Sequence, residues 1–475
     1  MKKLLILLFL LLPFVLRAQE REIDYAPLNA AVKEHLINLI KINTAQPEPD
    51  ETKAARYIYK VLNKHRIDWD IHRLEKPRGN LIAVLKADKD ARRSPGGVQE
   101  PLIMLAHLDT AAVQGQWQTP PTKATLKDKR IFGLGATDAK NYAAVNLTIL
   151  TWLKQNNIKL NRDIIFLFTA DEENGGARGL KFLYSKYPQK LKAGYALNEG
   201  GGFIEDGIGL KDIMFVEAAT KMYMDILVTA YGDGAHAALP GQNNAIYRLS
   251  LALAKIQEFR PPLQITPFTT NFFEKIYPLQ DDDAKTTMSI FLRSPDHAQR
   301  EQAARIISED PFFKTQLMDT ISPTIINAGI ESNTVSPEAH AILNCRLLPD
   351  TNPMQFFASL AALFENDDSI NLTIKERPQL PFPQPDPYSN DKLFKAIDRS
   401  VQEVYPGALT LAGISPAASD SEILRRNGVT TYGIGPRMEK SAEGPHQVDE
   451  NIAESDLYEQ LKLTLAIVLN FAEYK

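Results

Sequence analysis

Short apolar runs alternate with stretches of helical spacing over residues 28–200. Apolar side chains recur at three- and four-residue steps within 28–43, 52–66 and 141–155, and this spacing predicts three helices. Four short apolar runs predict strands, at 80–85, 102–106, 163–168 and 193–197. Strands that alternate with helices are typical of a mostly parallel sheet with helices on both faces. In such a sheet the ligand site lies beyond the carboxyl ends of the strands.

A different pattern begins near residue 219. Residues 222–230 alternate between apolar and polar positions, as expected for a half-exposed antiparallel strand. Two helices and two strands are predicted next, at 243–258, 353–366, 338–348 and 370–376. The segment 261–320 has no clear period, and we expect its three aspartates at 281–283 to form a solvated turn.

These changes of pattern divide the chain into expected domains. Residues 379–475 return to the alternation of helix and strand and end in a helix over 454–472. We therefore expect a discontinuous first domain, made of 19–218 and 379–475, with an α+β lid domain, 219–378, inserted into it. The predicted fold class is α/β, with a mostly parallel sheet in the first domain.

The N-terminal segment has the features of a signal peptide. Lys2 and Lys3 precede an apolar stretch over 4–16, and Ala18 offers a small residue for cleavage. The apolar stretch is shorter than the roughly 20 residues that span a bilayer. We expect a signal peptide over 1–18, no stable membrane span, and a protein that is exported to the periplasm or secreted. An uncleaved membrane anchor is the alternative.

Composition excludes some partners and ligands. The 54 basic and 58 acidic residues are nearly balanced and form no basic stripe, so we expect no nucleic-acid partner. The chain is 44% hydrophobic, which is enough to build a real core. Because Cys345 is the only cysteine, neither a disulfide within the chain nor a thiolate cluster can form. Any metal must be held by nitrogen and oxygen atoms.

Clusters of acidic and histidine residues stand at the ends of the apolar runs. They are His107-Leu108-Asp109, Asp138-Ala139-Lys140, Asp171-Glu172-Glu173 and Asn198-Glu199-Gly200, with His446 near the C-terminus. Taken singly, each has an ordinary interpretation, as a loop histidine, an aspartate at a helix start, an acidic turn or a turn carboxylate. Because three of them fall at one edge of the predicted sheet, we interpret them as one site.

Two imidazoles and three carboxylates suit a pair of shared cations. Asp138 has two oxygens and can bridge two ions about 3.5–4 Å apart. Asp109 lies two residues from His107 and can fix the tautomer of that imidazole. The adjacent side chains of Glu172 and Glu173 diverge, so we assign Glu173 as a metal ligand and Glu172 as a general base. A cation would also offset the repulsion between them. The sequence thus predicts a di-metal hydrolase.

The motifs resemble a known family. Its marks in this chain are Leu105-Ala106-His107-Leu108-Asp109-Thr110, GLGATDAK at 133–140, Thr169-Ala170-Asp171-Glu172-Glu173, Asn198-Glu199-Gly200-Gly201, and His446 followed by Glu450. Over nearly all of 50–470 the chain resembles the di-zinc exopeptidases that include acetylornithine deacetylase, succinyl-diaminopimelate desuccinylase, aminoacylase and carboxypeptidase S. The glycines after Glu199 and the long segment 261–320 look most like the carboxypeptidase S branch.

This resemblance implies a cofactor and a role for each site residue. The cofactor would be two zinc ions, although Co²⁺ or Mn²⁺ would suit the same ligand atoms. Glu172 would accept the proton of the attacking water, and Asp109 would orient a ligand imidazole. The implied ligands are His107, Asp138 and Glu199 for one ion, and Asp138, Glu173 and His446 for the other.

The inserted domain carries further motifs of the same family. His236, in GAHAALP at 234–240, resembles a lid histidine that would hydrogen-bond the developing oxyanion. Asn333 and Arg346 resemble a pair that grips a substrate carboxylate, to which the guanidinium fork is suited. A turn histidine and a surface salt bridge are the alternatives. The loop at 413–420 departs from the family's usual glycine-rich form, which affects the substrate preference more than the reaction.

The expected function is hydrolysis of an amide bond next to a free carboxylate. The enzyme would be a metallo-carboxypeptidase or an N-acyl-amino-acid hydrolase acting on small peptides or acyl-amino acids. We also expect that the lid domain can pair two copies into a homodimer. Two alternatives stay open: a dipeptidase or aminopeptidase on the same scaffold, and an inactive homologue that binds carboxylates. The complete ligand set and Glu172 argue against the second.

Overall fold

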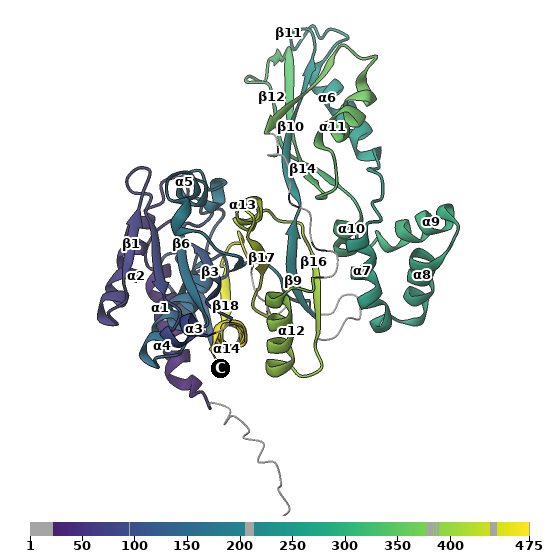
Figure 1. Cartoon of the computed structure of the whole chain (residues 1–475). Helices are drawn as coiled ribbons and strands as arrows, with labels where there is room; N and C mark the ends of the chain where they lie inside the picture. Colours follow the sequence, from purple (N-terminus) through teal and green to yellow (C-terminus); the bar gives the residue numbers. More distant parts are fainter. Residues whose placement is uncertain are drawn as a thin grey trace, which may run out of the picture.

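The computed structural model describes residues 22–94, 96–204, 213–376, 378, 383, 386, 389–437 and 444–474. The expected signal peptide over 1–18 lies outside these residues. Figure 1 shows a broad α/β base from which a narrower unit projects. Within the described ranges, no helix combines the length and the apolar character needed to cross a bilayer.

A nine-stranded sheet forms the base of the molecule, in the order β1-β2-β6-β3-β7-β17-β9-β16, with β8 paired to β9. The central strands β6, β3, β7 and β17 run parallel to one another. The bounds are β1 Trp69–His72, β2 Asn80–Leu85, β3 Gln99–His107, β6 Arg162–Thr169, β7 Tyr195–Asn198, β8 Gly202–Ile204, β9 Ile213–Thr220, β16 Leu409–Ser415 and β17 Thr430–Gly433. The four strands predicted in the first half all lie in this sheet, so the predicted fold class is confirmed.

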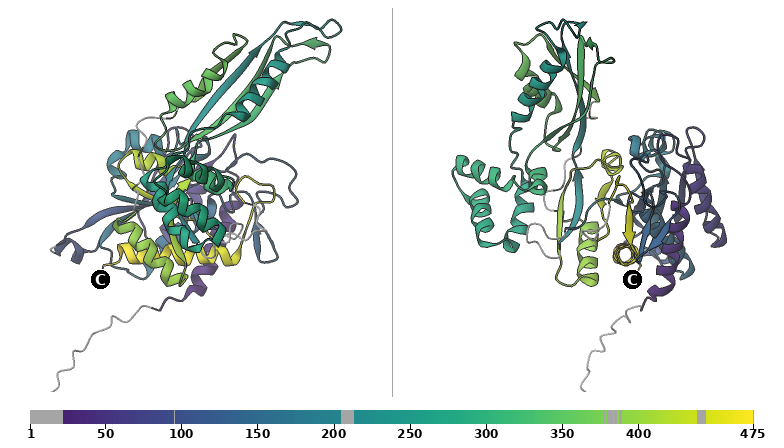
Figure 2. Two further views of the ribbon diagram at one scale, coloured as in Figure 1. Left: turned by 90° about the vertical axis from the view of Figure 1, so that its right-hand side faces the viewer. Right: turned by 180° about the vertical axis from the view of Figure 1, so that it is seen from behind.

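Helices cover both faces of the large sheet, as Figure 2 shows. Alternate residues of β3 point to opposite faces: Leu102 and Met104 join one core, and Ile103 and Leu105 join another. The first core includes α1 Tyr25–Ile40, α2 Glu51–Lys64, α4 Lys140–Gln155, α12 Lys392–Val404 and α14 Glu454–Ala472. The second includes α5 Leu180–Lys186 and α13 Ser421–Arg426.

The projecting unit is built on a four-stranded antiparallel sheet, in the order β12-β14-β10-β15. Its strands are β10 Met222–Tyr231, β12 Thr320–Ala328, β14 Glu338–Leu347 and β15 Ile370–Glu376. α6 Ala245–Glu258 and α11 Pro353–Ala361 pack with this sheet in a core of their own. The short pair β11 Ala235–His236 and β13 Thr334–Val335 lies at the tip, at the top of Figure 1. We call this unit the lid.

Four helices occupy the segment 261–320, in which no clear hydrophobic period was found. They are α7 Pro267–Ile276, α8 Asp282–Arg293, α9 His297–Ile307 and α10 Pro311–Leu317. The expected solvated turn at 281–283 is wrong, because Asp281 caps α8 and accepts a hydrogen bond from the backbone N–H of Ala284 at 2.8 Å. The helices share a core with Phe215 and Leu411 of the large sheet rather than with the lid strands. The range 219–378 is therefore divided between two cores, and the domain boundaries stay a prediction.

A three-stranded sheet links two distant parts of the chain. β5 Arg130–Phe132 pairs with β4 Thr125–Lys127 on one side and with β18 Asn451–Ala453 on the other. This pairing brings the loop that precedes α4 next to the segment that follows residue 444. The pairing of β5 with β18 explains why Asp138 and His446 lie close together although they are 308 residues apart in the sequence (446 − 138).

Candidate metal and catalytic site

The predicted site residues gather at one edge of the large sheet. His107 is the last residue of β3, and the turn that carries Glu172 and Glu173 follows β6. Glu199 follows β7 directly. Because these three strands are parallel, their carboxyl ends meet at this edge.

Asp138 lies between two groups of potential ligand atoms. Its Oδ1 is 3.0 Å from Nε2 of His107, which is also 3.3 Å from Oε2 of Glu199. Its Oδ2 is 3.2 Å from Nε2 of His446, which is 3.1 Å from Oε2 of Glu173. Within each group of three residues, one potential ligand atom per residue lies within 4.8 Å of the others. The structure thus brings together all five predicted ligands, with one aspartate common to both groups.

The donor set fits a pair of divalent cations. Three carboxylates packed so closely repel one another unless positive charge offsets them. Oε1 of Glu173 is buried and has no hydrogen-bond partner among the described residues, although a buried carboxylate oxygen normally has one. Carboxylate oxygens and imidazole nitrogens are suitable ligands for zinc. The residues therefore suit two cations, one held by each group of three.

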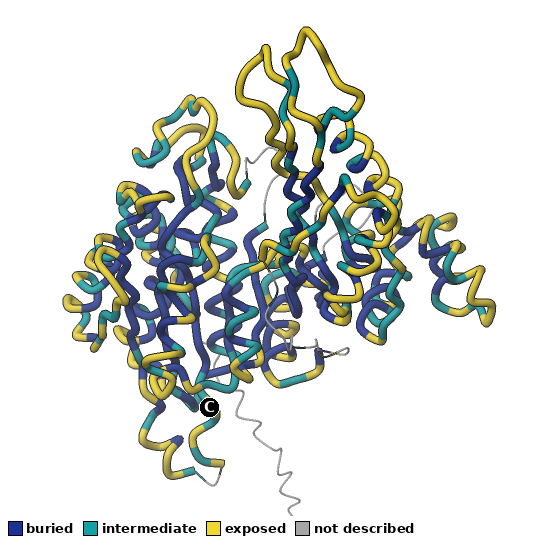
Figure 3. The backbone as a smooth tube through the Cα atoms, turned by 90° about the horizontal axis from the view of Figure 1, so that it is seen from above, coloured by how far each residue is buried: buried dark blue, intermediate teal, exposed yellow. Residues whose placement is uncertain are grey.

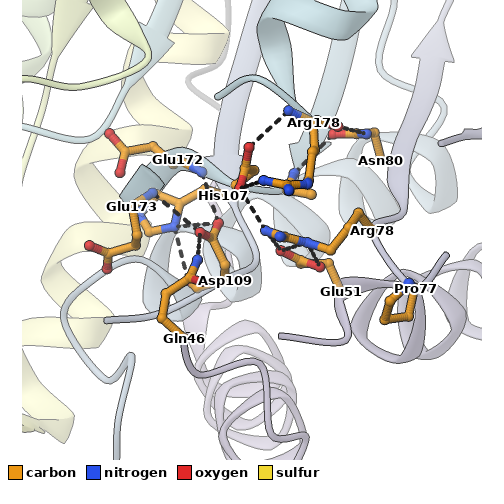
Figure 4. Close-up of polar contacts among 12 residues, drawn as sticks. Gln46, Glu51, Pro77, Arg78, Asn80, His107, Asp109, Glu172, Glu173 and Arg178 are labelled. Atoms are coloured by element: carbon orange, nitrogen blue, oxygen red, sulfur yellow. Dashed lines mark hydrogen bonds and ion pairs between the residues drawn. The ribbon is translucent and has the colours of Figure 1, made fainter. Parts of the chain in front are cut away.

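Asp109 holds the acidic turn more closely than it holds His107. Nδ1 of His107 is 3.0 Å from the backbone oxygen of Asp109 and 3.5 Å from its carboxylate. The carboxylate instead accepts hydrogen bonds from the backbone N–H groups of Glu172 at 3.1 Å and Glu173 at 3.2 Å. The side-chain amide of Gln46 donates a further hydrogen bond to the Asp109 carboxylate, at 3.2 Å. Asp109 thus contacts both the imidazole and the turn that carries the proposed base (Figure 4).

A buried ion network supports the acidic turn from its other side (Figure 4). Asp171 has a left-handed backbone, with φ of 68°, which is uncommon for a residue other than glycine. Its carboxylate accepts hydrogen bonds from the Arg78 guanidinium at 3.0 Å and from the backbone N–H of Arg178 at 2.8 Å. Arg78 also donates from Nε and from an Nη atom to Glu51, at 2.9 and 2.6 Å. Arg78 and Glu51 were not predicted from the sequence, because contacts between residues 93 and 27 positions apart leave no local pattern.

Two glycines allow the ligand loop after β7 to approach β9. Gly200 and Gly201 have φ of 116° and 65°, in the region that favours glycine. A Cβ at Gly200 would clash with Oε2 of Glu217, and a Cβ at Gly201 would clash with the backbone oxygen of Phe215. The two positions after Glu199 therefore require glycine for steric reasons.

Glu450 fixes the loop that carries Asp138. Its carboxylate accepts hydrogen bonds from the backbone N–H groups of Gly135 at 2.9 Å, Thr137 at 2.7 Å and Asp138 at 3.2 Å. Burial raises the pKa of this carboxyl to about 7, although the hydrogen bonds from the Thr137 backbone and hydroxyl oppose the shift. The motif that pairs His446 with Glu450 thus joins a predicted ligand to a residue that orients the bridging aspartate.

Glu172 projects into the cleft beside the two ligand groups. It lines a cavity of about 1220 Å³ together with Asp138, Glu173, Glu199 and His446. Burial raises the pKa of Glu172 well above its usual value, and the positive charge of a protonated imidazole at 107 opposes the shift. A carboxyl with a raised pKa is suited to take up a proton from water.

The three lid residues do not lie together. Arg346 lines the cleft, stacks at 4.8 Å over the ring of Tyr223 and donates from Nε to Asn344 at 2.9 Å. His236 and Asn333 instead lie at the tip, where the backbone N–H of Ala237 bonds the Asn333 oxygen. β14 separates the two places by roughly 25 Å at its rise per residue. The predicted pairing of Asn333 with Arg346 is therefore not formed within this chain.

Comparisons with known proteins identify relatives of this chain. The sequence model of Peptidase family M20/M25/M40 matches residues 103–470. The N-fatty-acyl-amino acid synthase/hydrolase PM20D1 of Mus musculus is 23% identical, over 79% of this chain and 75% of that protein. The probable carboxypeptidase S-like 2 of Dictyostelium discoideum is 25% identical, over 68% of this chain and 62% of its own length.

A solved structure shares the fold. The M20 family metallo-carboxypeptidase Sso-CP2 from Sulfolobus solfataricus aligns with a TM-score of 0.65 at 19% identity, over 93% of this chain and 98% of that one. The family model covers more than half of the chain, and the resemblance expected from the motifs is confirmed. The chain belongs to peptidase family M20/M25/M40, the metallopeptidases and related amidohydrolases.

Proposed function

We propose that this chain is a di-zinc exopeptidase or N-acyl-amino-acid hydrolase that cleaves an amide bond next to a free α-carboxylate. The position of Asp138 carries the proposal, because its two oxygens face His107 and His446 at 3.0 and 3.2 Å. The proposed ligands are His107, Asp138 and Glu199 for one zinc ion, and Asp138, Glu173 and His446 for the other. Co²⁺ or Mn²⁺ would suit the same atoms.

Glu172 is the proposed general base. Two zinc ions, when bound, lower the pKa of a water and polarise the scissile carbonyl. The Glu172 carboxylate accepts a proton from the attacking water and returns it to the nitrogen of the leaving amine. Asp109 and Asp171 keep the turn in place while the proton moves.

Arg346 is the proposed binding group for the substrate carboxylate. Tyr223 and Asn344 orient its guanidinium, and its Nη atoms have no partner among the described residues. The planar guanidinium can donate two parallel N–H hydrogen bonds to the two oxygens of a carboxylate. Such a group distinguishes substrates that end in a carboxylate from those that do not.

The test compares N-acetyl-amino acids with their carboxamides. Arg346→Ala should raise KM for the free acids by about 10- to 100-fold, the value of a charge-assisted hydrogen bond. The carboxamides should change little, and Arg260→Ala on the lid surface is the control. Equal cleavage of acids and carboxamides by the unaltered enzyme would contradict the proposal, because recognition would then not depend on the substrate carboxylate.

The lid surface supports a homodimer. Large apolar side chains stand exposed on α6 and β12: Tyr247 at 73%, Leu251 at 71%, Ile325 at 51% and Ile326 at 61%. β12 is also an edge strand in the described part of the sheet, with free backbone groups for pairing. Since His236 lies far from the cleft of its own chain, we propose that a second copy docked on this face supplies its histidine to the cleft as the oxyanion donor.

Export is proposed from the N-terminal sequence alone. The basic head, the apolar stretch and Ala18 predict cleavage between residues 18 and 19. N-terminal sequencing of the protein from culture medium and periplasmic extract should find Gln19 as the first residue. Recovery of uncleaved chain in the membrane fraction would instead support an anchor.

A further inference from the structure

The cleft extends well beyond the proposed metal and carboxylate sites. Its volume of about 1220 Å³ exceeds the roughly 300–1,000 Å³ that small-molecule sites usually have. Arg346 and Tyr223 line it from the lid, and Glu172 lines it from the turn after β6. Another part of the lining comes from the turn after Glu172, α5 and α13. We call this part the far lobe; it is lined by Asn174, Gly175, Lys181, Tyr184, Ile423 and Asn427.

The far lobe adjoins the turn that carries the proposed base. A Cβ at Gly175 would lie 3.8 Å from Nζ of Lys181, and a Cβ at Gly176 would lie 3.1 Å both from Oδ1 of Asp420 and from the end of the Ile423 side chain. In Figure 1, α5 lies on the side of α13 away from β10 and β14. A substrate with its carboxylate at Arg346 and its carbonyl beside Glu172 would have its acyl group on the side of the far lobe.

Polar side chains dominate the far lobe. Lys181 is exposed and forms no ion pair with any other described residue. The nearby Glu422 is neutralised by Arg426, whose guanidinium lies 2.7 Å from it. Ile423 is the only aliphatic side chain longer than alanine among the six residues of the lobe. A long alkyl chain gains about 25 cal/mol per Å² only against apolar surface, so this lining does not favour one.

We propose that the far lobe is a subsite for acyl groups that carry a second carboxylate, with Lys181 as the residue that determines this specificity. A glutaryl group, or the side chain of a glutamyl residue before the scissile bond, has this chemistry. The inference rests on the proposed function, because it assumes that the acyl side of an amide substrate occupies the lobe.

The test uses pairs of substrates that have the same shape and the same leaving amino acid. N-glutaryl-phenylalanine is compared with its neutral glutaramoyl analogue, and α-glutamyl-phenylalanine with glutaminyl-phenylalanine. An exposed ion pair contributes up to about 1 kcal/mol, so kcat/KM should favour each acid by about fivefold. Lys181→Met should remove this preference through KM. Lys186→Met, an exposed lysine of the same helix outside the cleft, should keep it.

Each outcome bears on a different part of the account. Preference for glutaryl but not for glutamyl would identify a dicarboxylic acyl group as the source of the carboxylate, and the reverse would identify a peptide. If Lys181→Met slows cleavage of the acids and of their neutral analogues equally, the lysine only stabilises the turn that carries Glu172, and the subsite is refuted. Faster cleavage of N-dodecanoyl-phenylalanine than of either short acyl group would also refute it. If no N-acyl-amino acid or dipeptide is cleaved, the proposed function fails and the subsite fails with it.

Discussion

The metal edge of the large sheet and the tip of the lid both carry predicted site residues, but the two regions differ in burial and in the contacts that these residues make. At the metal edge, His107 and Asp109 are almost fully buried and every ligand faces another ligand. At the tip, His236 is exposed and faces no ligand group. Figure 3 shows the same contrast in the backbone, which is buried along the sheet and exposed around the end of the lid.

The metal edge therefore brings its proposed site residues together within one chain, whereas the tip does not. The edge of the sheet assembles within one chain, because parallel strands deliver their ends to one place. The tip carries His236, the proposed oxyanion donor, but lies roughly 25 Å along β14 from Arg346. Substitutions at the edge should therefore act on their own chain, whereas substitutions at the tip should act on a second chain.

The largest expected effect comes from Glu172. Glu172→Ala should lower kcat by about 10²–10⁴-fold, because the proton of the attacking water loses its acceptor. The metal content should stay the same, since Glu172 is not among the proposed ligands. Steady-state kinetics and metal analysis of one preparation measure both. Substantial residual turnover in a metal-loaded variant would refute the assignment of the base.

A smaller and more distinctive effect is expected at His236. His236→Ala should lower kcat by about 10²–10³-fold, as is typical when an oxyanion donor is lost. Mixing this variant with Glu172→Ala, each inactive alone, should restore activity, because a mixed dimer contains one site with both residues intact. Leu239→Ala, which alters an exposed side chain of the same tip, is the control. No recovery after subunit exchange would mean that the histidine acts within its own chain.

The smallest effect on kcat is expected from Arg78, whose side chain supports the acidic turn. Arg78→Lys keeps the charge but loses the fork that binds Glu51 and Asp171 together. A shift of the turn by a fraction of an ångström should lower kcat by about 10-fold with little change in KM. The exposed Arg305→Lys serves as the control. A lower melting temperature with an unchanged kcat for the folded enzyme would show that Arg78 is structural only.

Local patterns allowed the metal edge to be predicted from the sequence. His107, Glu173 and Glu199 each end or closely follow a short apolar run, so their place at strand ends could be inferred from periodicity. Asp138 and His446 lie in loops and were assigned from the resemblance of their motifs to a known family. The α/β class followed from the same alternation. The helical segment over 267–317 was missed although Asp281 is an N-cap residue of a common type, because three aspartates in succession also suit a turn.

Long-range geometry could not be predicted in the same way. Arg78 and Asp171 are brought together only when β2 and β6 pair. The separation of Asn333 from Arg346 depends on the length and direction of β14, which motifs do not encode. The packing of α7 to α10 on β9 and β16 likewise depends on which apolar surface remains uncovered once both sheets have formed.

The central claim is that one aspartate holds two cations at the end of the sheet. Elemental analysis of the protein loaded with zinc and then desalted tests it most directly, with Asp138→Ala beside the unaltered chain and Asp128→Ala, a loop substitution, as the control. The account predicts two zinc ions for each unaltered or control chain and a loss of tightly bound zinc from both positions in Asp138→Ala. Full zinc content in Asp138→Ala, or full activity in a chain that holds no divalent metal, would contradict it.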